Sequence, residues 1–110
     1  MSGFSAEWLA QREAADHGAR NREILGRVAA HFTAYDTLSI VDLGSGTGSN
    51  LRGCALALPA LRQHWTLVDH DPQLIQAARV RLRAWADDAR DDGEGLALRK
   101  DGKTITVTWR

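Results

Sequence analysis

Three alternating glycines, Gly44, Gly46 and Gly48, follow a short apolar segment in the stretch IVDLGSGTGSN. A glycine permits a positive backbone φ and lets a ligand approach the main chain without meeting a Cβ atom. Asp69 stands at the end of a second apolar segment, WTLVD. A carboxylate there can accept hydrogen bonds from both hydroxyls of a ribose. Since ligands of open parallel sheets bind beyond the carboxyl ends of the strands, the pattern indicates a site for an adenosine-type cofactor.

Two other nucleotide-binding patterns fit this loop less well. The dinucleotide fingerprint is G-x-G-x-x-G, but Ser49 stands where its third glycine should be. A P-loop requires a lysine after its glycines, and none follows here. A nicotinamide-dependent oxidoreductase is therefore the less favoured alternative, and a P-loop NTPase is excluded.

The stretches IVDLGSGTGSN and LVDHDP together resemble the class I S-adenosylmethionine-dependent methyltransferases. In that family a strand that ends in an acid is followed by L-G-x-G-x-G, which residues 42–48 match position for position. The resemblance implies S-adenosylmethionine as the cofactor and transfer of its methyl group to an acceptor, without identifying catalytic residues. The cofactor-binding residues that it implies are Asp42, Gly44, Ser45, Gly46, Gly48, Asn50, Asp69, His70 and Asp71.

The resemblance also implies what these residues contact. The backbone of residues 44–46 faces the methionine part of the cofactor, and Asp42 supports its ammonium group directly or through water. Asp69 holds the ribose hydroxyls, and His70 and Asp71 lie beside the adenine. For Asp42, a structural role in accepting loop N–H groups is an equal alternative.

The N-terminal helices look like the lid helices that precede the first motif in many of these enzymes. An arginine from such a lid often reaches the cofactor carboxylate, and Arg12 and Arg20 are both candidates here. The alternative function is a non-catalytic module that binds S-adenosylmethionine or a nucleotide, or a partner subunit. Trp8, on a lid helix, could face a substrate.

The elements that must position these residues divide into three segments. Residues 1–37 read as helices, with Ser5 as the first N-cap. Residues 38–90 read as a βαβα core, in which residues 38–43 form a strand buried on both faces. In this core one helix continues to Pro59, and another begins at Asp71 as N-cap and runs to about residue 86.

Residues 91–110 read as an acidic loop followed by a hairpin. The stretch DDARDDGEG predicts a solvated loop, and LALRKDGKTITVTW predicts two strands that turn at Asp101 and Gly102. Pairing Lys100 with Lys103 brings the apolar residues of both strands to one face. The pairs are Leu98 with Ile105 and Leu96 with Val107.

The predicted fold class is α/β, a truncated Rossmann-like three-layer parallel sheet with N-terminal helices and a C-terminal hairpin. The family's full fold has seven strands and usually needs about twice this length. Without a fourth strand, the edge of residues 38–43 is unpaired, and such edges invite pairing with another chain. We therefore expect a part of a longer enzyme or, as the alternative, a sheet completed by a partner or by self-association.

Composition narrows the class of protein. Lysine plus arginine and aspartate plus glutamate both number 14, so the formal net charge is +0. This favours a small-molecule acceptor over nucleic acid. One cysteine, Cys54, excludes an internal disulfide framework, and the histidines show no metal-ligand spacing. No signal peptide and no membrane-spanning run is recognisable, so we expect a cytoplasmic protein with no metal site.

Overall fold

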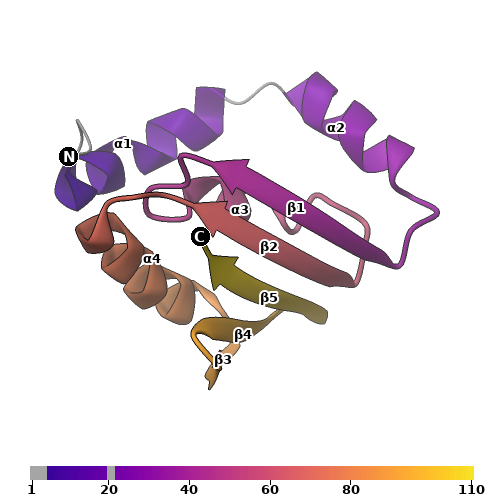
Figure 1. Ribbon diagram of the computed structural model, residues 1–110. Coiled ribbons are helices and arrows are strands. Elements are labelled where there is room, and N and C mark those ends of the chain that lie inside the picture. The colour runs from indigo at the N-terminus through magenta and orange to yellow at the C-terminus, as the bar shows by residue number, and fades with distance from the viewer. Residues whose placement is uncertain (1–4, 20–21) are drawn as a thin grey trace.

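The computed structural model describes residues 5–19 and 22–110 of the chain (Figure 1). The elements in this part are α1 (Ala6–Ala19), α2 (Arg22–His31), β1 (Thr37–Leu43), α3 (Ser49–Cys54), β2 (Arg62–Val68), α4 (Pro72–Trp85), β3 (Asp88–Asp92), β4 (Gly95–Lys100) and β5 (Lys103–Trp109). None of the helices in these two ranges has both the length and the apolar character needed to cross a membrane.

The strands form one open sheet in the order β1-β2-β5-β4-β3. The first three strands of this order are parallel, whereas β4 and β3 are antiparallel to their neighbours. The prediction of an α/β fold is confirmed. A wholly parallel three-layer arrangement is not confirmed, because the sheet is mixed.

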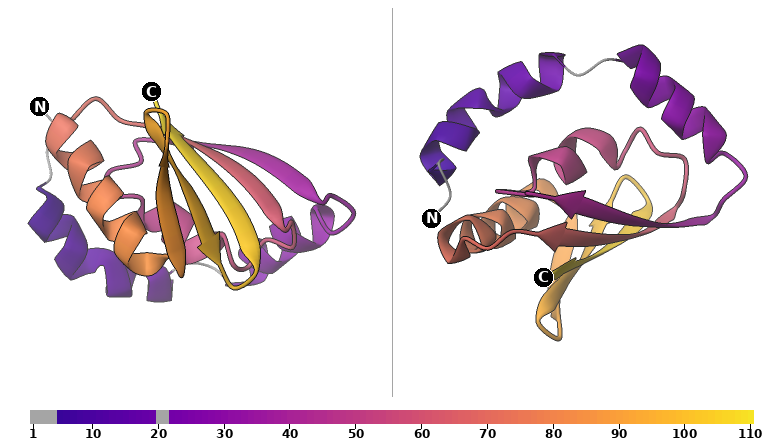
Figure 2. Two further views of the ribbon diagram at one scale, coloured as in Figure 1. Left: turned by 90° about the horizontal axis from the view of Figure 1, so that it is seen from below. Right: turned by 45° about the horizontal axis from the view of Figure 1, so that its top comes forward.

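Helices α3 and α4 cover the same face of the sheet. Side chains from α3 and α4, Leu51 and Leu82, belong to one buried cluster with strand residues such as Leu67 and Ile105. Among the described elements no helix lies across the opposite face, which Figure 2 shows open. On β1 this face carries Val41 and Leu43, which are 62% and 78% exposed. The expectation that residues 38–43 are buried on both faces is therefore wrong.

Several local predictions are confirmed. The Ser5 hydroxyl accepts the N–H of Trp8, and the Asp71 carboxylate caps α4 by accepting the N–H of Gln73. The register of β4 with β5 is the predicted one. Their turn has positive φ at Asp101 and Gly102, 48° and 78°, as a type I′ turn requires.

Two element predictions are corrected. The acidic stretch forms strand β3 rather than a loop, because an edge strand needs hydrogen bonds from one neighbour only and its charged side chains can stay in water. The helix predicted to continue to Pro59 ends at Cys54. Leu51, in this helix, and Ala55 and Leu58, in the segment after it, are buried, and Cys54 is half-buried.

Gly95 should be the least replaceable glycine of the sheet. A Cβ atom there would lie 2.2 Å from the carbonyl oxygen of Val107, so the β4–β5 ladder would have to open. We expect Gly95→Ala to lower the free energy of unfolding by about 2 kcal/mol, as overpacking does. Urea denaturation followed by circular dichroism measures this change.

Gly26→Ala is the matched control for this substitution. A Cβ on Gly26 meets nothing within 4 Å, and alanine is the better helix former by about 1 kcal/mol. Stability should stay the same or rise slightly. Equal effects of the two alanine variants would contradict the clash at Gly95.

Candidate functional site

The candidate site lies where β1 and β2 end. The two strands are parallel and in register to their last residues, since Leu43 pairs with Val68. The Ser45 N–H then donates to the Val68 carbonyl at 2.9 Å. The loops that leave the two strands therefore start side by side, at the edge where open parallel sheets bind ligands.

The glycine loop, residues 44–48, depends on its glycines for its shape. The φ angles of Gly44, Gly46 and Gly48 are +67°, +56° and +82°, a region that other residues seldom adopt. The two residues between them, Ser45 and Thr47, are 6% and 1% exposed. Neither hydroxyl has a hydrogen-bond partner among the described residues. The loop thus brings buried polar atoms close to the strand ends.

Asp69 joins the two loops. One carboxylate oxygen accepts the Gly46 N–H and the other accepts the Asp71 N–H, both at 2.9 Å. Its own N–H donates to the Arg110 carbonyl at 3.2 Å, which ties it to the end of the sheet. A carboxylate has about four acceptor sites, so these two bonds leave capacity for further donors.

Asp42 and Asn50 are also brought together. The Asn50 amide donates to Asp42 Oδ1 at 3.1 Å. Asp42 is 8% exposed, whereas Asn50 is exposed to solvent. This bond links the end of β1 to the start of α3, which is a structural role for Asp42.

A surface pocket of about 480 Å³ lies over the start of α4. It is lined by His70, Asp71, Pro72 and Gln73, of which the last two were not among the predicted site residues. Its lining continues directly from Asp69 along the chain.

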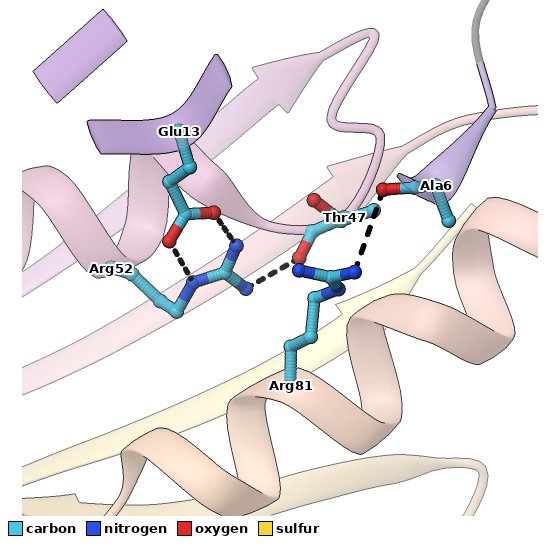
Figure 3. A network of polar contacts seen from close by, with 5 residues as sticks. All are labelled: Ala6, Glu13, Thr47, Arg52 and Arg81. Carbon is cyan, nitrogen blue, oxygen red and sulfur yellow. Dashed lines mark hydrogen bonds and ion pairs between the residues drawn. The ribbon is translucent and has the colours of Figure 1, made fainter. Parts of the chain in front are cut away.

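Helix α1 lies against the glycine loop through a polar network (Figure 3). The Arg52 side chain, 6% exposed, forms a two-pronged ion pair with Glu13 of α1, which is 24% exposed. The same guanidinium donates to the Thr47 carbonyl at 2.6 Å. From α4, Arg81 donates to the Ala6 carbonyl at 3.4 Å. These contacts attach α1 to the loop and to α4.

An apolar contact reinforces this attachment. A Cβ atom on Gly46 would lie 3.2 Å from Cδ1 of Leu9, so the α1 side chain fills the space beside that glycine. Sequence analysis did not identify Leu9, Glu13 or Arg52 as part of the site. Glu13 and Arg52 are 39 residues apart, so no local spacing links them.

Neither of the two predicted lid arginines is placed at the glycine loop by a contact that the structure describes. The Arg12 guanidinium stacks over the Trp8 ring at 4.9 Å, on α1 itself. Arg20 lies outside the residues that the structure describes. Within residues 5–19 and 22–110, no group of three or more histidine, cysteine or acidic side chains could hold a metal ion.

Glu13→Ala should loosen α1. Removing one partner of a buried ion pair costs about 3–5 kcal/mol, and we expect about 2 kcal/mol here because Glu13 is partly exposed. Amide hydrogens of α1 should exchange faster, as mass spectrometry can measure.

The matched control is Glu23→Ala. Glu23 pairs with Arg27 on α2, where both side chains are more than three-quarters exposed, at 76% and 79%. Such a pair contributes at most about 0.5 kcal/mol. If Glu13→Ala changed the free energy of unfolding no more than Glu23→Ala, the ion pair between Glu13 and Arg52 would not be what attaches α1 to the glycine loop.

Comparisons of the chain with protein-family models, with curated proteins and with solved structures found no match.

Proposed function

We propose that the glycine loop and Asp69 bind S-adenosylmethionine, and that the chain is the cofactor-binding portion of a methyltransferase. The observation that carries this proposal is the 2.9 Å hydrogen bond between the Asp69 carboxylate and the Gly46 N–H. It brings the two parts of the sequence motif together at the ends of neighbouring parallel strands. That is the juxtaposition which a ligand with a ribose between an adenine and an amino-acid chain would need.

The acceptor capacity of Asp69 supports the ribose assignment. The two hydrogen bonds that its carboxylate accepts come from backbone N–H groups, which hold the carboxylate in a fixed orientation. The remaining acceptor positions suit two vicinal hydroxyls. The adjoining pocket of about 480 Å³ over His70, Asp71, Pro72 and Gln73 then suits the adenine ring.

The position of α1 sets a condition on binding. The resemblance assigns the backbone of residues 44–46 to the methionine part of the cofactor, and at Gly46 that space holds the Leu9 side chain. In the proposal α1 moves away from the loop before the cofactor enters. Because the cost of this movement is part of the measured dissociation constant, Glu13→Ala should bind S-adenosylhomocysteine more tightly than the wild-type chain.

The sheet order supports a Rossmann-like interpretation of the parallel strands. The order β5-β2-β1 corresponds to the 3-2-1 half of a doubly wound sheet, with β4 and β3 added at its outer edge. In this interpretation the glycine loop follows the first strand of the doubly wound unit. The finer assignment to a three-layer fold is part of the proposal.

The chemistry proposed for this site is limited to binding and orientation. When bound, the cofactor supplies an electrophilic methyl group for in-line displacement by an acceptor. The residues of this chain would hold the ribose, orient the ligand and exclude water around it. No residue is assigned as a general base.

Calorimetric titration tests the proposal. The chain should bind S-adenosylhomocysteine and should not bind NAD, because Ser49 replaces the third glycine of the dinucleotide fingerprint. Binding of NAD and not of S-adenosylhomocysteine would contradict the proposal and favour a nicotinamide-dependent oxidoreductase.

A further inference from the structure

The outer edge of β1 is open. β1 is the first strand of the sheet order, so within the described residues no strand pairs with its side away from β2. Its sequence, TLSIVDL, has neither the lysine nor the proline that commonly protect edge strands. Its one charged residue, Asp42, is buried and bonded to Asn50. This edge is therefore chemically suited to pairing with another strand.

The hydrogen-bond pattern identifies which residues point outward. The Arg62 N–H donates to the Asp36 carbonyl. Since bonding groups alternate along a strand in a parallel ladder, residues 38, 40 and 42 continue the bonding toward β2. The backbone groups of residues 37, 39, 41 and 43 therefore point to the open edge.

Helix α2 overhangs this edge (Figure 1). A groove of about 430 Å³ runs between α2 and the sheet. It is lined by Leu25, Val28 and Phe32 on the helix side, by residues 38–41 of β1, and by Cys54, Leu58 and Trp65. None of the residues of α2 is buried. The apolar side of α2 is thus only partly covered, and it lies near the vacant strand position beside β1.

We propose that β1 pairs in antiparallel fashion with β1 of a second copy of this chain, forming a two-fold dimer with a continuous sheet. In the proposed register, Ile40 lies opposite Ile40 of the second copy. Thr37 then lies opposite Leu43 of the second copy, and Ser39 lies opposite its Val41. All four outward-pointing residues of each strand then meet outward-pointing residues, as hydrogen-bonded antiparallel pairs require. This inference rests on the open edge of β1 and uses neither Asp69 nor the glycine loop as evidence.

The second copy suits this edge for two further reasons. In this register Asp42 lies opposite Leu38, so like charges do not meet, and the net charge of +0 gives no overall repulsion between copies. Both copies present the same patch, as an isologous interface requires. The incoming strand would also lie next to the partly exposed apolar side of α2.

Light scattering after size-exclusion chromatography tests the dimer. The wild-type chain should elute at twice its monomer mass at roughly 100 μM. Val41→Pro removes one outward N–H and should give a monomer with an unchanged circular dichroism spectrum, since proline is tolerated where the N–H faces away from the sheet. Val41→Thr keeps the N–H and the branched shape, so it should remain a dimer. A monomeric wild type, or a dimeric Val41→Pro, would overturn the proposal.

A pair of double variants tests the register without proline. Ser39→Glu with Val41→Lys places opposite charges across the dimer axis and should remain dimeric. Ser39→Lys with Val41→Lys places like charges directly opposite and should be monomeric, because such pairs destabilise antiparallel strands. Equal association of the two double variants would show that residues 39 and 41 do not face each other, which would contradict the proposed pairing.

Discussion

Asp69→Ala is expected to weaken S-adenosylhomocysteine binding by at least about 100-fold. Each hydrogen bond to a charged group contributes about 1.5–3 kcal/mol, and the proposed site loses two of them when the carboxylate is removed. The fold should remain, because the β2 backbone ladder does not involve this side chain. Isothermal titration calorimetry of the purified variant measures the change.

Asp69 also accepts two backbone N–H groups, so its removal affects the loops themselves. Gly95→Ala serves as the control, since it lowers stability at the β4–β5 pairing instead of at the loops. If a destabilised chain with an intact Asp69 still binds normally, the loss in Asp69→Ala reflects the missing carboxylate. Unchanged affinity in Asp69→Ala would refute the ribose assignment.

Gly46→Val is expected to abolish binding. Gly46 has φ of +56°, where a β-branched residue is strained, and its added side chain would meet Cδ1 of Leu9 at 3.2 Å. The valine would also occupy the space proposed for the methionine part of the cofactor. We expect no detectable heat in a titration that readily measures the wild-type chain.

Gly93→Val is the matched control for backbone strain. Gly93 has φ of +62°, and a Cβ there meets nothing within 4 Å. It lies in the turn between β3 and β4, at the other edge of the sheet from β1. This variant should lose a similar amount of stability yet bind the ligand. A folded Gly46→Val that still binds would mean that the glycine loop is only a turn.

Local sequence signals predicted the elements that depend on neighbouring residues. The cap at Asp71 and the hairpin turn at Asp101 and Gly102 are set by short-range chemistry, and both are confirmed. Alternation of apolar residues fixed the hairpin register, because a shift by one residue would turn its core side chains to water.

Several features that depend on distant residues were not predicted. The polar composition of residues 88–92 predicted a loop, but these residues form strand β3 because β4 supplies its hydrogen bonds. The run from Leu38 to Leu43 looked buried on both faces, but its sequence does not reveal that one face of the sheet lacks a covering helix. Apolar strand residues show only that burial is favourable, and not whether a second layer supplies it.

The candidate site also has a part that the sequence predicted and a part that it did not. The closeness of Asp69 to Gly46 follows from two parallel strands that end together, and the sequence was sufficient to place both there. The contact of α1 with the loop through Glu13, Arg52 and Leu9 joins segments far apart in the chain. Only the three-dimensional structure brings these residues together.

The most direct test of the central claim is a titration with S-adenosylhomocysteine followed by NMR of backbone amides. The proposal predicts saturable shifts of the Gly44, Gly46 and Asp69 amides, accompanied by shifts along α1 as the helix moves. The amides of Gly93 and Gly102, in the turns of the β3–β4 and β4–β5 hairpins, should stay unchanged. Absence of shifts in the glycine loop at saturating ligand would contradict the proposed cofactor site.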